Sequence, residues 1–65
     1  MISKGDLVRI TLFDDGNQIF ENTPNVWRVI NLEFSGTKSI IENTTVKDIK
    51  ARSISTWKLT KIYTD

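Results

Sequence analysis

The 65-residue chain contains no cysteine and no histidine. Without cysteine it can form no disulfide and has no thiolate nucleophile, and without either residue the usual zinc ligands are missing. Histidine is also the commonest general base near neutral pH. We therefore expect a protein that is not an enzyme and that carries neither a metal nor another cofactor.

A strong charge of one sign and long apolar runs are missing too. Nine Lys and Arg residues face eight Asp and Glu residues, which leaves a net charge of +1 and no global attraction for nucleic acid or a membrane. No apolar run approaches the roughly 18 residues of a membrane span. Residues 1–6 are polar from the third residue onward, so we expect no secretory signal and a cytoplasmic protein.

The length allows a single domain, which we place at residues 1–65. A chain this short buries only about 60% of its unfolded surface, and this one lacks the disulfides and metals that often compensate. We see no internal repeat, linker or low-complexity segment. Stability must therefore come from apolar packing, a well-paired sheet or association with a partner.

Alternating apolar residues predict the first strands. In residues 6–13, Val8, Ile10 and Leu12 share one face, as in a strand with one buried side. Residues 26–34 form the strongest predicted strand, and its apolar residues lie on both faces, which suits a central, bent strand. A turn at 35–38 and a third strand at 39–43 follow.

Residues 14–25 read as one long loop. Asp, Gly and Asn at 14–17 are turn residues, and Pro24 cannot donate a hydrogen bond to a sheet. Ile19 or Phe20 is expected to pin this loop to the body of the domain.

The stretch Val46–Arg52 fits two readings, because its apolar residues suit either a helical face or a strand. We favour a strand over Ile49–Ile54. Ser55–Leu59 is predicted to form a one-turn 3₁₀ segment, and residues 60–63 a last short strand.

This order of elements resembles the SH3-like small β-barrel. The resemblance is carried by Lys4–Ile10, a lysine-glycine-aspartate entry into the first strand, and by Ile54–Ile62, a one-turn segment with a closing strand. It implies an all-β, five-stranded barrel with a long first loop. The first loop holds Phe20 as its only aromatic residue, whereas SH3 domains that bind proline-rich peptides carry an aromatic-rich loop, so no binding residue is carried over.

Protein binding is the function we expect first. The long loop suggests it, since long loops in compact domains tend to be functional, and tryptophan is enriched at interfaces. We predict that Trp27 is partly exposed and that Trp57 is mostly buried at the closing turn. The predicted contact surface comprises Phe20, Trp27, Asp14 and Asp15.

The adjacent carboxylates at 14 and 15 have a catalytic and a structural interpretation. Asp14 and Asp15 read as turn residues rather than as a catalytic pair, because catalysis needs a cleft and a perturbed pKa.

The protein partner could be a second copy of this chain or a different protein. The Asn, Ile, Lys and Thr usage is typical of an A/T-rich genome, such as that of a phage or a low-GC bacterium.

Binding of single-stranded nucleic acid is the alternative function. Residues 44–65 hold five cationic side chains against two anionic ones, and the neighbouring Trp57 and Tyr63 could stack on bases. The structural alternative is a solvated face whose lysine stems cover apolar surface. The predicted nucleic-acid-binding residues are Lys47, Lys50, Arg52, Lys58 and Lys61.

Overall fold

The computed structural model describes residues 1–63 as five strands and two single 3₁₀ turns. The all-β prediction is confirmed. In chain order the elements are β1 (Leu7–Ile10), η1 (Gln18–Phe20), β2 (Trp27–Glu33), β3 (Lys38–Asn43), β4 (Arg52–Ser55), η2 (Thr56–Lys58) and β5 (Leu59–Lys61).

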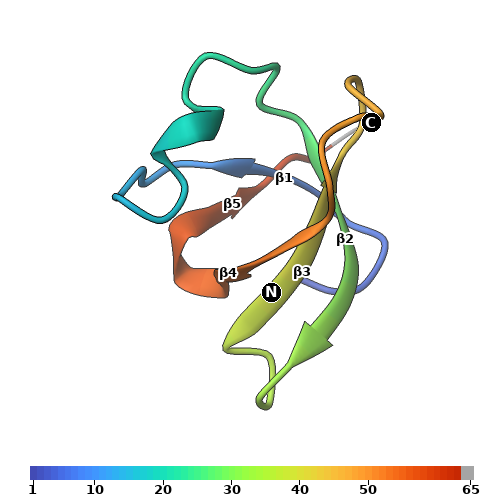
Figure 1. Ribbon diagram of the computed structural model, residues 1–65. Helices are drawn as coiled ribbons and strands as arrows, with labels where there is room; N and C mark the ends of the chain where they lie inside the picture. Colours follow the sequence, from blue (N-terminus) through green and yellow to red (C-terminus); the bar gives the residue numbers. More distant parts are fainter. Residues whose placement is uncertain (64–65) are drawn as a thin grey trace.

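The five strands form one antiparallel sheet in the order β4-β3-β2-β1-β5 (Figure 1). β4 and β5 follow each other in the chain and are joined by η2, yet they lie at opposite edges of the sheet. The predicted closure into a barrel is therefore wrong: within residues 1–63 the sheet stays open, and β4 is one of its edges.

β1 shows the predicted alternation but is shorter than residues 6–13. Val8 and Ile10 are buried and Arg9 between them is exposed. Leu12, which was expected on the same buried face, is 45% exposed. The Thr11 N–H still donates to the Lys58 carbonyl, one step beyond the pairing of Ile10 with Leu59, and the strand ends before Leu12 is reached.

A bulge in β2 determines which of its residues face the core. Trp27 and Val29 are fully buried, and the pairing with β3 shifts between Val29 and Asn31. The extra residue, Ile30, reverses the parity of the residues after it, so that Leu32 rather than Asn31 packs against the core. This bulge explains why both parities of the sequence carry apolar residues.

The turn between β2 and β3 is unusual because Phe34 and Ser35 both adopt left-handed backbone angles, with φ of 52° and 56°. The Gly36 N–H closes the turn onto the Glu33 carbonyl at 3.1 Å. Turns with two such residues strongly favour Asn and Gly. Phe34 is 75% exposed, so its ring gains little packing in return for the strained backbone.

The segment between β3 and β4 is neither helix nor strand over most of its length. Turns and bends occupy residues 44–49, and β4 begins only at Arg52. The helical alternative for Val46–Arg52 is therefore wrong, and the favoured strand over Ile49–Ile54 is confirmed only from Arg52 onward. The Asn43 side chain holds this segment, because its carbonyl accepts the N–H groups of Thr45 and Val46 at 2.9 Å.

The core is centred on Trp27, whose exposed fraction is 0%. The Phe20 ring meets it edge-on, at 5.1 Å between ring centres, and this contact confirms that Phe20 pins the long loop. Ile19 beside it is 75% exposed. The buried apolar residues are Val8, Ile10, Phe20, Trp27, Val29, Ile41, Ile54 and Leu59.

Asn25 joins the end of the long loop to β1. The register of β1 and β2 places residue 25 opposite Ile10, but the bonds come from the Asn25 side chain instead of its backbone. Its amide accepts the Ile10 N–H at 2.9 Å and donates to the Ile10 carbonyl at 2.8 Å. The same Oδ1 accepts the indole N–H of Trp27 at 3.0 Å.

Replacing Asn25 with alanine leaves these three groups without their partners. We expect Asn25→Ala to lower the free energy of unfolding by about 2–3 kcal/mol, since each buried polar group without a partner costs about 1–3 kcal/mol. Urea unfolding followed by tryptophan fluorescence measures the change. Asn22→Ala, an exposed asparagine of the same loop, is the matched control and should change stability by no more than about 0.5 kcal/mol.

Replacing Phe34 should have the opposite effect. We expect Phe34→Asn to raise the free energy of unfolding by about 0.5–1 kcal/mol, because asparagine tolerates the left-handed region at lower cost. Phe34→Leu removes the ring without easing the backbone and should give no such gain. Equal stability of both variants in urea unfolding would contradict a strained turn.

Candidate binding groove

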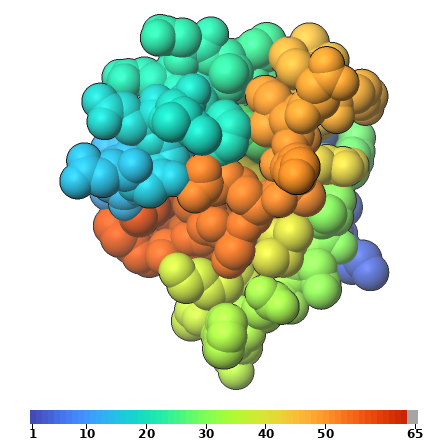
Figure 2. Space-filling model, in the orientation of Figure 1, coloured from blue at the N-terminus to red at the C-terminus, as the bar shows by residue number. Residues whose placement is uncertain are grey.

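A groove of about 490 Å³ lies between the long loop and the edge strand β4. In Figure 2 the loop and the strand lie side by side at the surface, as the cyan and orange segments. The groove is lined by Asp14, Asp15, Gly16, Asn17, Lys38, Arg52, Ser53, Ile54, Ser55 and Lys58.

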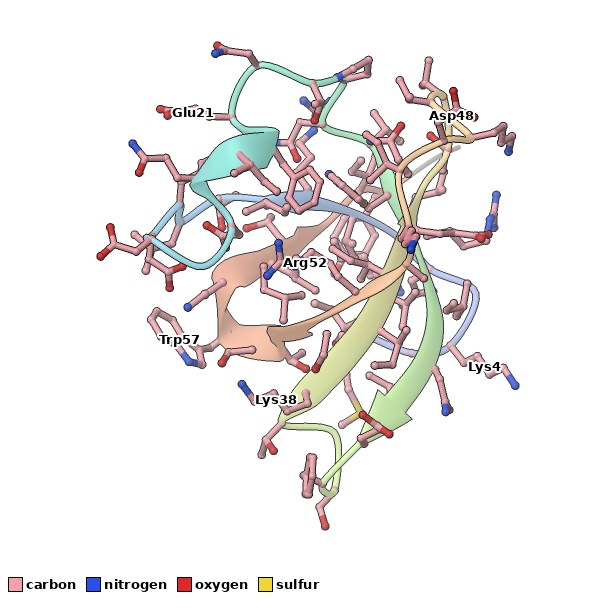
Figure 3. All side chains as sticks on the ribbon, viewed as in Figure 1. Lys4, Glu21, Lys38, Asp48, Arg52 and Trp57 are labelled. Atoms are coloured by element: carbon pink, nitrogen blue, oxygen red, sulfur yellow. The ribbon has the colours of Figure 1, made fainter. Side chains whose placement is uncertain are left out.

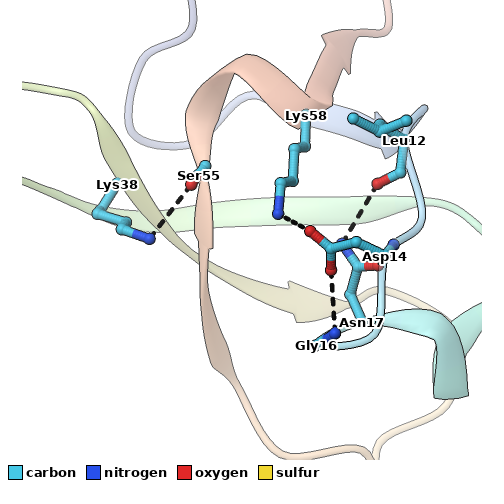
Figure 4. Close-up of polar contacts among 7 residues, drawn as sticks. All are labelled: Leu12, Asp14, Gly16, Asn17, Lys38, Ser55 and Lys58. Carbon is cyan, nitrogen blue, oxygen red and sulfur yellow. Dashed lines mark hydrogen bonds and ion pairs between the residues drawn. The ribbon is translucent and has the colours of Figure 1, made fainter.

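The loop wall is fixed by the side chains of Asn17 and Asp14 (Figure 4). Asn17 is 2% exposed; its amide accepts the Asp14 N–H at 2.7 Å and donates to the Leu12 carbonyl at 3.3 Å. The Asp14 carboxylate accepts the Gly16 N–H at 3.0 Å and forms an ion pair with Lys58 of η2. The loop is thereby tied to the turn that joins β4 to β5.

The opposite wall is the whole of β4, because all four of its residues line the groove. Ile54 is buried and anchors the strand in the core. At the end of the strand, Lys38 of β3 reaches the groove and donates from Nζ to the Ser55 hydroxyl at 3.2 Å. Lys38 and Ser55 are opposite each other in the register of the two strands.

Arg52 begins β4 and extends toward the long loop (Figure 3). Its guanidinium carbon lies 5.0 Å from the centre of the Phe20 ring, a cation–π contact. Its Nε is buried and has no hydrogen-bond partner within residues 1–63. No ion pair in the described part of the chain involves Arg52 either.

The two tryptophans are buried in the reverse of the predicted order. Trp27 is fully buried, whereas Trp57 in η2 is 70% exposed. The cause is topological: η2 turns at the surface, while Trp27 starts the central strand β2 and lies within the core. The Nζ of Lys58 lies 5.5 Å from the Trp57 ring centre, so Trp57 stands next to the groove.

The predicted protein-contact residues are thus divided. Asp14 and Asp15 lie in the groove, but Phe20 and Trp27 belong to the core. Trp27 is fully buried and Phe20 nearly so, so they offer a partner few or no atoms; Phe20 supports the groove from below through its contact with Arg52. Sequence reasoning missed Lys38, Ser53 and Ser55, whose place in the groove follows from the pairing of β3 with β4.

The five predicted nucleic-acid contacts do not form one continuous stripe. Lys58 and Lys61 form ion pairs with Asp14 and Asp6, and Arg52 lies against the core aromatic ring. Lys47 and Lys50 flank Asp48, whose loop lies at the opposite side of Figure 3 from Trp57.

A second hollow, of about 360 Å³, lies beside the start of β1. Here Asp6 accepts the Ser3 N–H at 2.8 Å, and its carboxylate lies 3.3 Å from the Nζ of Lys61. The Ser3 hydrogen bond, followed by Lys61, lowers the pKa of the Asp6 carboxyl below its usual value of 3.8. The hollow is lined by Gly5, Asp6, Leu7, Arg28, Lys61, Ile62 and Tyr63.

Residues 1–63 were also compared with the requirements of a metal site and of a membrane-spanning helix. This part of the chain contains no group of three or more Asp or Glu side chains placed to hold a metal ion. It also contains no helix with the length and apolarity needed to cross a membrane.

No family model matches the chain, and neither does any curated protein or any solved structure.

The Asp6 contacts predict a pH dependence. Because the carboxyl has a lowered pKa in the folded state, it contributes stability above its unfolded pKa of about 3.8–3.9, and this contribution is lost as the pH falls through the lowered value. We expect Asp6→Asn to be less stable than the wild type at pH 6, with the difference shrinking as the pH falls through the lowered pKa. Urea unfolding across this range measures it. Asp15→Asn is the control, because exposed Asp15 forms no ion pair within residues 1–63.

Proposed function

We propose that the chain is a small, non-enzymatic protein-binding module that docks its partner in the groove between the long loop and β4. The observation that carries this proposal is the combination of the groove with an edge strand and an exposed tryptophan at one place. Edge strands offer backbone groups to a partner, and tryptophan is the residue most enriched at binding hot spots. Trp57 is 70% exposed, so it is available as such an anchor.

The rigidity of the groove supports this function. The Asp14–Lys58 ion pair and the buried Asn17 amide fix one wall, and the pairing of β4 with β3 fixes the other. A preformed site loses less conformational entropy on binding than a flexible one. A protein partner is therefore the best match, and self-association through the same groove belongs to the same proposal.

We also propose that the fold is an SH3-like small β module. The strand order β4-β3-β2-β1-β5, the long loop between β1 and β2 and the 3₁₀ turn between β4 and β5 support this assignment. A cytoplasmic setting and a phage or bacterial origin complete the proposal, and they are supported by the missing cysteine and the residue usage.

A peptide selection tests the binding function. We expect a random peptide library, selected on the immobilised wild-type protein, to yield sequences whose affinity falls at least about tenfold in Trp57→Ala, as for a typical hot-spot residue. Fluorescence titration with the selected peptides measures the affinity. The exposed Trp57 should be replaceable without loss of the fold.

Tyr63→Ala is the matched control, because Tyr63 is 78% exposed and lies under Lys61 as Trp57 lies under Lys58. It should leave binding unchanged. A selection that enriches no sequence, or peptides that lose equal affinity in both variants, would overturn the proposed groove. Tight, salt-sensitive binding of oligothymidylate without any peptide binding would favour the nucleic-acid alternative.

A further inference from the structure

We infer that the groove takes an extended, acidic segment of the partner, which adds to β4 as an antiparallel strand and places a carboxylate on Arg52. This inference rests on the protein-binding function proposed above and specifies the chemistry of the partner. Its two supports are the backbone groups that β4 presents and the cations that have no carboxylate partner.

The free backbone groups of β4 follow from its register. The Thr56 N–H donates to the Thr37 carbonyl at 2.9 Å, and these residues continue the pairing of Ser55 with Lys38. Hydrogen-bonded pairs alternate along an antiparallel ladder, so Ile54 and Arg52 bond to β3. Ser53 and Ser55 therefore direct their N–H groups away from β3, toward the open edge.

Three of these outward groups are available. The register turns the Ser53 N–H, the Ser53 carbonyl and the Ser55 N–H away from β3, and within residues 1–63 no loop, turn or side-chain hydrogen bond uses them. The Ser55 carbonyl, in contrast, belongs to the N-cap residue of η2 and is taken by the first bond of that turn. Residues 53 and 55 lie about 6.7 Å apart, which is the two-residue repeat of a strand. An added antiparallel strand would exchange two bonds with Ser53 and give a carbonyl to Ser55.

The charge at this edge selects an acidic segment. Of the three groove cations, Lys58 is compensated by Asp14, but Arg52 and Lys38 have no carboxylate partner within residues 1–63. The Arg52 guanidinium is held against Phe20 with its Nε desolvated and without a partner. A carboxylate placed on the terminal nitrogens of Arg52 would give this guanidinium, which has no ion pair within residues 1–63, a charge-assisted hydrogen bond.

The alternation of a strand then fixes the spacing within the segment. Side chains opposite Arg52 and Ile54 fall on the face of β4 that carries these two residues. Because the added strand runs antiparallel, the residue opposite Ile54 precedes the one opposite Arg52 by two positions. The preferred segment therefore reads apolar, any residue, acidic.

The other edge of the sheet, β5, lacks the combination of a groove and a cation without a carboxylate partner. Of the β5 residues, only Lys61 lines a hollow, and it is paired with Asp6. Leu59 is buried. This leaves β4 as the strand to which the segment adds.

Three synthetic heptapeptides test the inference: acetyl-Ser-Thr-Val-Ser-Glu-Ser-Thr-amide and its versions with Gln or Lys in place of Glu. NMR titration of the wild-type protein gives their affinities and the hydrogen exchange of individual amides. We expect the Glu peptide to bind at least about tenfold more tightly than the Gln peptide, as for a charge-assisted bond, and to slow exchange at Ser53 and Ser55. The amides of Arg52 and Ile54, already bonded to β3, should change little.

Arg52→Gln should abolish the preference for Glu over Gln, while Lys47→Gln, an exposed cation outside the groove, should leave it intact. Lys38→Gln is a second variant that should reduce the preference if Arg52→Gln does not fold. Equal affinity for Glu and Gln peptides, unprotected Ser53 and Ser55 amides in the complex, or tighter binding of octathymidylate would overturn the inference. If library peptides still require Trp57 in that case, the proposed function survives and only the acidic strand is wrong.

Discussion

The fold depends on the hydrogen bonds of one side chain, the amide of Asn25. It stands in for a backbone residue opposite Ile10 and binds the Trp27 indole as well. The chain can therefore leave β1, run through a long loop that contains Pro24, and return to the sheet while Ile10 keeps both of its partners. In a domain with no disulfide and one small core, this amide and that of Asn17 fix the two ends of the long loop that forms one wall of the groove.

Much of the fold could be predicted from local patterns. Alternation identified β1, and the segment after the turn at 35–38 identified β3. The isolated apolar pair in the loop offered Ile19 or Phe20 as its anchor, and the structure selects Phe20. The burial of Trp27 could not be predicted, because β2 carries apolar residues on both parities and its pairing with β3 decides which face is buried. The exposure of Trp57 could not be predicted either, because it follows from the position of η2 at the surface. The prediction of a closed barrel was wrong, because closure depends on whether the two edge strands of the sheet meet, and local sequence patterns do not show this.

The candidate site was predicted in pieces. Asp14 and Asp15 were assigned to one binding hypothesis, and Arg52 and Lys58 to another, yet the fold brings all four into one groove. The Asp14–Lys58 ion pair joins residues 44 positions apart in the chain, and no sequence pattern at either end indicates it. Lys38 and the two serines were missed because their role comes from strand pairing, which sets which backbone groups face outward.

Positive charge on an edge strand has a second explanation, because lysines at edges discourage uncontrolled pairing between sheets. That explanation fits a charge that extends into water, as on an ordinary solvated surface. It fits Arg52 poorly, because its guanidinium is held against Phe20 and its Nε is buried without a partner. A protective charge has no need for this desolvation, which carries a cost. A carboxylate brought by a partner offsets that cost, which favours an acidic strand over an uncharged one at β4.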